Sequence, residues 1–365
     1  MKQTHRYIIL FLFLCACTNQ VHDQLKGAIK ANKEAKSLVE WDSSSLNPSF
    51  LFANLRAREK DEPNIGDDVC SGLKQLGDQD LSLFDSEINN DQNSHLLRNC
   101  KVELKKRLED YWAEQRKNLQ SLDLNFTFPT KVEKRDLTNG YRAATGDVAD
   151  KELILTFDDG PDPNNTMQVL DILKVVGAKV MFFEIGPHVT ANPLITYRQA
   201  QEGHTIGSHT MTHRCLADTP ICVKANNGTP LTTDEAEDEI RGGHQAIYDV
   251  LGFVDPFFRF PFGESDPALR DFLAGKHVAQ FYWSIDSEDW KNQTDDNLLQ
   301  NVLSQIDKAQ KGIVLFHDIQ RRTLEILPSF LKGIYDRGYT LVVLASTEEN
   351  ARYNSLLVTK KPDNP

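Results

Sequence analysis

Residues 151–185, KELILTFDDGPDPNNTMQVLDILKVVGAKVMFFEI, contain the pattern that decides the fold. Leu153–Phe157 is an apolar run of strand length, and Lys179–Ile185 is a second one. Between them, Asn164–Val176 places apolar residues at helical spacing, and Gly177 follows just past its end. A strand, a helix and a strand in this order predict two parallel strands joined by a crossover helix.

The same alternation continues downstream, and it predicts an α/β domain over residues 151–350. Further strands are expected at Thr205–Ile206, Phe257–Arg259, Val278–Trp283, Ile313–Phe316 and Thr340–Val343. Residues 126–150 are interpreted as a connector that enters this domain, and residues 351–365 as a C-terminal tail.

Residues 18–125 have a different character, because they are charged and contain few glycines or prolines. Lys101–Leu119 carries apolar residues at mostly helical spacing, and Leu25–Leu38 and Phe50–Arg58 have helical patterns too. This part of the chain is predicted to be mainly α-helical, and it contains no motif that indicates chemistry.

The amino terminus, residues 1–17, has the features of an export signal. Lys2 and Arg6 precede the apolar run Ile8–Leu14, which is much shorter than the roughly 20 residues that span a bilayer. The run ends near Cys17, in a context similar to a bacterial lipobox. The expected location is therefore the periplasm or cell envelope, with lipidation of Cys17 as the membrane anchor. The alternative is an ordinary cleaved signal and a secreted protein.

Export makes the other cysteines informative. Cleavage before Cys17 would remove Cys15, and lipidation would use Cys17. This leaves Cys70, Cys100, Cys215 and Cys222, which allow three pairings. The local pairs Cys70–Cys100 and Cys215–Cys222 are favoured. Cys215 and Cys222 could instead be zinc ligands, but an exported protein more often oxidises such a pair.

Composition excludes several classes of protein. The chain has 365 residues, of which 40% are hydrophobic and 26% charged, so wholesale disorder, collagen and a polytopic membrane protein are excluded. A net charge of −12 argues against binding to nucleic acid, which usually requires a basic surface.

Polar residues follow the expected strands, where α/β folds place their functional sites. Asp158 and Asp159 end the first strand, and adjacent carboxylates are costly unless a cation or a proton offsets their repulsion. His209 and His213 are four residues apart, so on a helical turn they would share one face. Together with one aspartate they predict a metal site with open positions, which is typical of catalytic metals. The alternative for the aspartates is a solvated loop.

Three further stretches add candidates. Arg259 can pair with a carboxylate, Asp289 and Trp290 combine a charge with an aromatic face, and His317 emerges from an apolar strand as a general acid should. Taken singly, His317 could be a satisfied core histidine and Trp290 an ordinary core residue.

In this order, TFDDGP, HTMTH, RFPFG, DSEDW and LFHD resemble the five motifs of the NodB-like polysaccharide deacetylases, the fourth carbohydrate esterase family. The resemblance covers residues 152–345. It implies a distorted (β/α) barrel, preceded here by the helical region. It also implies a hydrolase acting on carbon–nitrogen bonds other than peptide bonds, with one divalent metal ion that in this family is usually zinc.

The resemblance also implies roles for the polar residues. Asp159, His209 and His213 correspond to the metal ligands. Asp158 corresponds to the general base that takes a proton from the attacking water, and His317 to the acid that protonates the leaving amine.

Five supporting residues follow from the same resemblance. Arg259 would orient the base, Asp289 would tune the acid, and the main-chain N–H of Phe262 would stabilise the oxyanion. Trp290 and Leu315 would line the pocket for the sugar and the acetyl methyl group. The family often has tyrosine where Phe262 stands, which leaves the sugar specificity open.

The expected substrate is a polysaccharide that contains N-acetylglucosamine, with peptidoglycan favoured in an exported bacterial protein. Chitin oligosaccharides, an exopolysaccharide and O-acetylated xylan are alternatives. A catalytically dead glycan-binding protein is a further alternative, which a missing ligand, base or acid would favour.

Overall fold

A parallel β-sheet forms the centre of the computed structural model, which describes residues 48–359. The strand order is β1-β10-β3-β4-β5-β6-β7-β2, and in addition β9 pairs with β3 and β8 with β9. The strands are β1 (Thr130–Arg135), β2 (Arg142–Ala143), β3 (Glu152–Asp158), β4 (Met181–Glu184), β5 (Thr205–Ser208), β6 (Phe257–Arg259), β7 (Ala279–Phe281), β8 (Ile285–Asp286), β9 (Gly312–His317) and β10 (Thr340–Ser346). The predicted α/β class is confirmed.

Strand β3 has three neighbours, which makes the barrel uneven. Strand β9 runs along one edge of β3 from Leu153 to Asp158. The opposite edge is shared, because β10 pairs with residues 152 and 153 whereas β4 pairs with residues 156–158. The sheet therefore forks at β3, as expected for a distorted barrel.

The alternation of side chains along β3 separates two cores. Leu153, Leu155 and Phe157 belong to the outer core, which the helices cover, whereas Ile154 belongs to the inner core of the barrel. Successive side chains on a strand point to opposite faces. Asp158 therefore follows Ile154 into the interior of the barrel.

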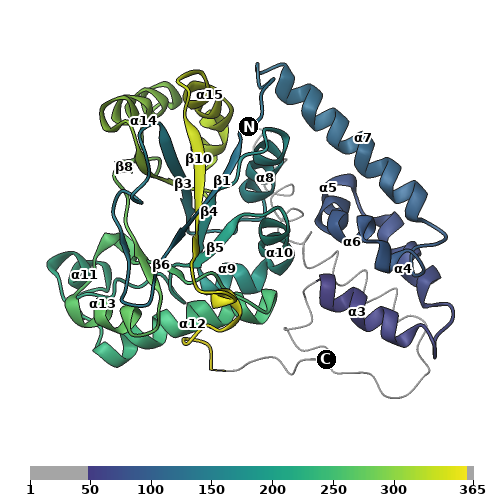
Figure 1. Ribbon diagram of the computed structural model, residues 1–365, viewed down its shortest axis with the longest axis horizontal. Coiled ribbons are helices and arrows are strands. Elements are labelled where there is room, and N and C mark those ends of the chain that lie inside the picture. The colour runs from purple at the N-terminus through teal and green to yellow at the C-terminus, as the bar shows by residue number, and fades with distance from the viewer. Residues whose placement is uncertain (1–47, 360–365) are drawn as a thin grey trace, which may run out of the picture.

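Helices surround this sheet (Figure 1). They are α8 (Asn165–Val175), α9 (Gly186–Ala191), α10 (Pro193–Gln201), α11 (Pro220–Ala225), α12 (Thr233–Leu251), α13 (Pro267–Ala274), α14 (Asp295–Ala309) and α15 (Arg321–Asp336). Helix α12 begins with a capping box between Thr232 and Glu235 and ends at Gly252, whose φ of 73° favours glycine.

The helical region lies beside α8 and α10 (Figure 1). It comprises α3 (Pro48–Arg58), α4 (Ile65–Gln75), α5 (Asp78–Leu81), α6 (Asp85–Asn89) and α7 (Lys101–Gln120), as predicted for these residues. Tyr111 on α7 donates a hydrogen bond of 2.5 Å to Asp171 on α8, and the ammonium group of Lys174 lies 4.1 Å from the ring centre of Trp112. One hydrophobic core is continuous from this layer into the barrel. The expected helix Leu25–Leu38, the signal sequence and Cys17 lie outside the described residues.

Residues 126–150, interpreted from the sequence as a connector that enters the α/β domain, contribute two strands to its sheet. Strand β1 pairs with β10, and strand β2 pairs with β7. The sequence of β1, TKVEKR, alternates exposed and half-buried residues and lacks an apolar run, as befits an edge strand. Because β1 lacks an apolar run, hydrophobic patterning of the sequence did not identify it as a strand.

The predicted tail also differs from the structure up to Thr359. Arg352 forms an ion pair of 3.0 Å with the buried Asp255, and its carbonyl accepts a hydrogen bond from the N–H of Val254. Leu357 is fully buried. These contacts dock the segment on the barrel, whereas residues 360–365 lie outside the described residues.

Both favoured disulfides form. Cys70 pairs with Cys100 and joins α4 to the start of α7, while Cys215 pairs with Cys222 across the beginning of α11. Within residues 48–359, none of the helices combines the length and apolar character needed to cross a membrane.

Replacing Cys70 and Cys100 together by serine is expected to lower the free energy of unfolding by about 3–4 kcal/mol, because the bridge restricts a long loop in the unfolded chain. Urea denaturation followed by circular dichroism measures this change. The matched control is the double serine variant of Cys215 and Cys222, which opens a shorter loop and should cost about 2–3 kcal/mol. A smaller loss for the Cys70 and Cys100 variant than for this control would contradict the loop-length argument.

Candidate active site

Asp158, which faces the interior of the barrel, is the more deeply placed of the two adjacent aspartates, and its side chain is buried. Its Oδ1 accepts a hydrogen bond of 2.6 Å from Nη1 of Arg259 on β6, which reaches it across the barrel interior from beyond β4 and β5. Strand register places Asp158 opposite His317 of β9 and opposite Phe183 of β4. The carboxyl ends of parallel strands meet at one edge of the sheet, so residues far apart in sequence converge here.

Arg259 connects several parts of this site. Its guanidinium also donates to Oγ1 of Thr156 at 2.8 Å and to the carbonyl of Tyr282 at 3.0 Å, and it lies 4.3 Å from the ring centre of Phe183. An arginine with these fixed partners holds Asp158 in one orientation.

Asp159 has a different environment from Asp158. Its φ of 72° turns the chain out of the strand, and its Oδ1 is buried without a hydrogen-bond donor among the described residues. This oxygen lies 3.4 Å from Nε2 of His209 and 3.3 Å from Nε2 of His213. The structure therefore separates the two aspartates: Asp158 is held by arginine, and Asp159 faces the histidines.

The two histidines meet, but not on a helical turn as the sequence suggested. After β5 the chain forms a tight loop, in which Thr210 has φ 74° and His213 has φ 58°. Oγ1 of Thr210 accepts a hydrogen bond of 2.9 Å from the N–H of His213. The carboxylate of Glu239 on α12 accepts one of 2.7 Å from the N–H of Thr212. Side chains thus replace the helical hydrogen bonds that the spacing of four residues implied.

These three side chains fit a metal ion. Their candidate ligand atoms all lie within 4.8 Å of one another. Nδ1 of His209 donates to the carbonyl of Arg259 at 2.7 Å, so Nε2 of the neutral ring directs a lone pair at the carboxylate. A lone pair facing Oδ1 of Asp159, which has no donor among the described residues, is unfavourable unless a cation or a proton lies between them. Two histidines and one carboxylate are ligands that zinc and similar ions accept.

Electrostatics keeps both histidines ready to act as ligands. Burial lowers the pKa of His209 well below its ordinary value, with the charge of His213 acting in the same direction. Burial also lowers the pKa of His213, although the charge of Asp159 opposes it. Neutral imidazole is the form that binds metals.

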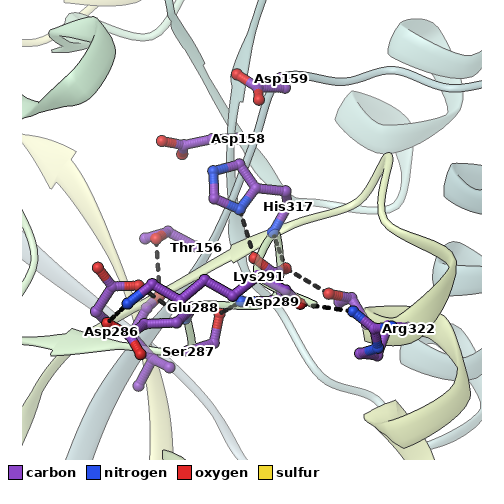
Figure 2. A network of polar contacts seen from close by, with 12 residues as sticks. Thr156, Asp158, Asp159, Asp286, Ser287, Glu288, Asp289, Lys291, His317 and Arg322 are labelled. Carbon is purple, nitrogen blue, oxygen red and sulfur yellow. Dashed lines mark hydrogen bonds and ion pairs between the residues drawn. The ribbon is translucent and has the colours of Figure 1, made fainter. Parts of the chain in front are cut away.

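His317 occupies the other side of the site, and in Figure 2 its ring lies between Asp289 and the pair of aspartates. Its Nδ1 donates a hydrogen bond of 2.7 Å to Oδ1 of Asp289. Its main-chain N–H donates another, also of 2.7 Å, to Oδ2 of the same carboxylate. With Nδ1 engaged in this way, Nε2 is the nitrogen available to a substrate.

The partners of Asp289 were not found from the sequence. Thr323 on α15 donates a hydrogen bond to Oδ2 of Asp289, and the N–H of Asp289 donates 3.3 Å to Oγ of Ser287. Thr156 belongs to the TFDDGP motif but received no role from the sequence, although its Oγ1 accepts a hydrogen bond of 2.8 Å from Arg259. A buried threonine has no distinctive sequence pattern, so only its contacts reveal these roles.

The acid and base candidates have shifted pKa values. Burial lowers the pKa of His317, but the hydrogen bond and charge of Asp289, with the charges of Asp159 and Asp158, outweigh it and raise the pKa to about 9. Burial raises the pKa of Asp158 to about 6, although the charges of Arg259 and His317 oppose this. At neutral pH His317 therefore carries a proton that it can donate, whereas Asp158 is ionised and can accept one.

The remaining predicted residues border the site. Phe262 has φ 62°, its ring centre is 5.1 Å from that of His213, and its side chain is about half exposed. Trp290 is also exposed, which excludes the core-packing alternative. Leu315 is buried and pairs in register with Asp286 on β8.

Comparisons with known proteins agree with this geometry. A family model described as polysaccharide deacetylase matches residues 145–278. The solved structure of the peptidoglycan deacetylase Bd3279 of Bdellovibrio bacteriovorus is similar, with 42% sequence identity and a TM-score of 0.59, over 94% of this chain and 99% of that chain. The similarity therefore includes the helical region.

Two curated proteins are related at lower identity. The peptidoglycan-N-acetylglucosamine deacetylase PgdA of Listeria monocytogenes is 28% identical over 90% of this chain, which spans 64% of the length of that relative. The chitooligosaccharide deacetylase of Rhizobium leguminosarum is 31% identical over 53% of this chain and 89% of its own length.

Replacing Asp289 by asparagine is expected to lower the pKa of His317 from about 9 towards its ordinary value of 6.5, because burial then meets less opposition. A nuclear magnetic resonance titration of the ring protons measures this pKa. The matched control is Asp286→Asn, which removes a nearby carboxylate that does not bond to His317. If the pKa of His317 is unchanged in Asp289→Asn, the carboxylate of Asp289 is not the cause of the raised value.

Stability should change with pH in the corresponding way. Because the folded pKa of His317 exceeds the unfolded value of 6.5, protonated His317 stabilises the fold fully below pH 6.5, and this contribution is lost as the pH rises through about 9. The decrease in the free energy of unfolding between pH 6.5 and about 9 should be smaller in Asp289→Asn than in the wild type.

Proposed function

The chain belongs to the polysaccharide deacetylase family, and from this premise we propose that it is a metal-dependent hydrolase that removes N-acetyl groups from a glycan and releases acetate. The arrangement around Asp159 carries this proposal. One carboxylate oxygen, which has no hydrogen-bond donor among residues 48–359, lies 3.3 and 3.4 Å from two histidine nitrogens. A carboxylate fixed by arginine and a histidine paired with an aspartate lie beside it.

We assign each group one task. Asp159, His209 and His213 would hold the divalent ion, with zinc the metal that their donor atoms favour. When bound, this ion would act as a Lewis acid, which makes water more acidic and polarises the acetyl carbonyl. Asp158 would accept the proton of the attacking water, since Arg259 keeps its carboxylate oriented and its pKa is raised to about 6.

Breakdown of the tetrahedral adduct requires a proton for the leaving nitrogen. His317 would supply it, because its pKa of about 9 keeps the ring protonated at neutral pH. We assign stabilisation of the oxyanion to the main-chain N–H of Phe262, a residue whose ring centre lies 5.1 Å from that of His213. The exposed ring of Trp290 would offer an apolar face to the sugar.

Peptidoglycan is the substrate that we favour. The similarity to the Bdellovibrio peptidoglycan deacetylase covers almost the whole chain, whereas the chitooligosaccharide deacetylase matches about half of it. Two disulfides support a protein that folds outside the cytoplasm, where cell-wall glycan is accessible. Lipidation of Cys17 remains part of this proposal.

Mass spectrometry of peptidoglycan fragments after incubation with the purified protein tests this function. We expect loss of acetyl groups from N-acetylglucosamine in peptidoglycan, and less or none from chitin oligomers and O-acetylated xylan. Preferential deacetylation of chitin oligomers would support the alternative substrate. Binding without release of acetate from any of the three would support a glycan-binding protein.

The two aspartates should respond differently to substitution. Asp158→Asn removes a base but no ligand, so turnover should fall by about 10²–10⁴-fold while the metal stays bound. Asp159→Asn is the matched variant, and it should lose both metal and turnover. Elemental analysis and acetate release measure the two quantities. A metal-free Asp158→Asn variant that is folded by circular dichroism would reverse these assignments.

His317→Ala should impair amide cleavage more than cleavage of an activated ester. An amine leaves poorly without a proton, whereas the phenolate of an aryl acetate needs none. Rates on an N-acetylated glycan and on an aryl acetate provide the comparison. Equal losses on both substrates would be inconsistent with His317 acting as the acid.

A further inference from the structure

Asp159 adopts a backbone conformation that needs support. A non-glycine residue at φ 72° costs free energy, and such residues persist where the surrounding structure holds them. The position of a metal ligand depends on this main chain, because the aspartate side chain is short. The contacts of the main chain of Asp159 therefore bear on the geometry of the site.

The segment from Asp159 to Pro161 is hydrogen-bonded to β4 and to the residues that follow it. The N–H of Asp159 donates 3.1 Å to the carbonyl of Phe183, and the N–H of Ile185 donates 3.1 Å to the carbonyl of Gly160. Nδ2 of Asn192 donates 3.2 Å to the carbonyl of Pro161. These three hydrogen bonds hold the turn, but none of them is accepted by the carbonyl oxygen of Asp159.

A histidine that none of the five motifs contains completes this set. Nδ1 of His188, on α9, lies 2.6 Å from the carbonyl oxygen of Asp159. A carbonyl oxygen only accepts, so Nδ1 carries the proton and donates it. His188 also lies near His213, whose pKa its charge lowers, as a smaller effect than burial and the charge of Asp159.

The first turn of α9 also contacts the second ligand-bearing loop. The N–H of Gly186 donates 3.2 Å to the carbonyl of Thr210, between His209 and His213. A Cβ at Gly186 would collide with the sulfur of Met211 in that loop, so a larger residue there would displace the Met211 side chain. One short helix thus bonds to both segments that carry the ligands.

We propose that His188 is a positioning residue, whose Nδ1–H fixes the main chain of Asp159 and thereby the distance between Asp159 and the two histidines. This inference rests on the metal site of the proposed function. Groups that orient ligands from outside the coordination shell typically change metal affinity by about 10–100-fold.

Substitution of His188 tests this inference by metal binding. The metal-free protein is titrated with Zn²⁺ against a chromophoric chelator, and with Co²⁺ to follow its absorption spectrum. His188→Ala should bind Zn²⁺ about 10–100-fold more weakly, and the Co²⁺ spectrum should change because the ligand geometry relaxes.

A matched pair of variants isolates the hydrogen bond. In His188→Asn the side-chain nitrogen is bonded to Cγ, as Nδ1 is in histidine, so the donor is kept and affinity should return to near the wild-type value. In His188→Gln the nitrogen is one bond farther from the main chain, so affinity should stay low. The control His277→Ala removes an exposed histidine two residues before β7 and should leave Zn²⁺ affinity unchanged.

The outcomes separate the two proposals. Wild-type protein that binds no Zn²⁺ would overturn the proposed metal site itself. If the wild type binds and His188→Ala binds equally tightly, the positioning role alone is wrong. Equal losses in His188→Asn and His188→Ala would also overturn it, since donation from Nδ1 would not matter. Should His188→Ala not fold, the comparison of the asparagine and glutamine variants decides by the same criterion.

Discussion

Arg259 is the residue on which the site depends. Its guanidinium binds the buried carboxylate of Asp158, and its carbonyl accepts the Nδ1–H of His209. The same residue therefore fixes the orientation of the candidate base and of a candidate metal ligand. A buried arginine is tolerated only with its partners in place, because desolvation of an unpaired charge is costly. The apolar strands around it exclude water, and its side-chain partners, Thr156 and Asp158, are supplied by the inward face of β3.

That inward face shows how the fold separates chemistry from packing. The odd-numbered residues from Leu153 to Phe157 pack against helices, whereas the even-numbered residues turn towards the barrel interior. Asp158 continues this alternation, and the turn at Asp159 then breaks it. Two neighbouring aspartates thus receive different environments from one strand end. One is held by arginine and the other faces two histidines, which is the asymmetry that a base and a ligand require.

Backbone conformation adds a second constraint. Five non-glycine residues with positive φ border the site: Asp159, Thr210, His213, Phe262 and Glu288. Each costs free energy that the surrounding hydrogen bonds must offset, and such residues gather where function requires a particular geometry. The hydrogen bonds of Thr210, Glu239 and His188 fulfil this need around the ligands. The sheet fixes the positions of these loops, and the positive φ angles within the loops orient the side chains of the site.

The sequence alone determined the alternation of strands and helices, because it depends on periodicity along the chain, and it favoured the local disulfide pairs among three possible pairings. It also identified the polar residues now found together, such as Asp158 and His317, through their places after apolar runs. The edge strand β1, the loop that brings His209 and His213 together, and the hydrogen bonds from Thr323 and His188 were decided only by tertiary structure. Apart from the bond within the histidine loop, these are contacts between segments distant in sequence, and an exposed edge, a threonine or a lone histidine has no periodic pattern that would indicate its partner.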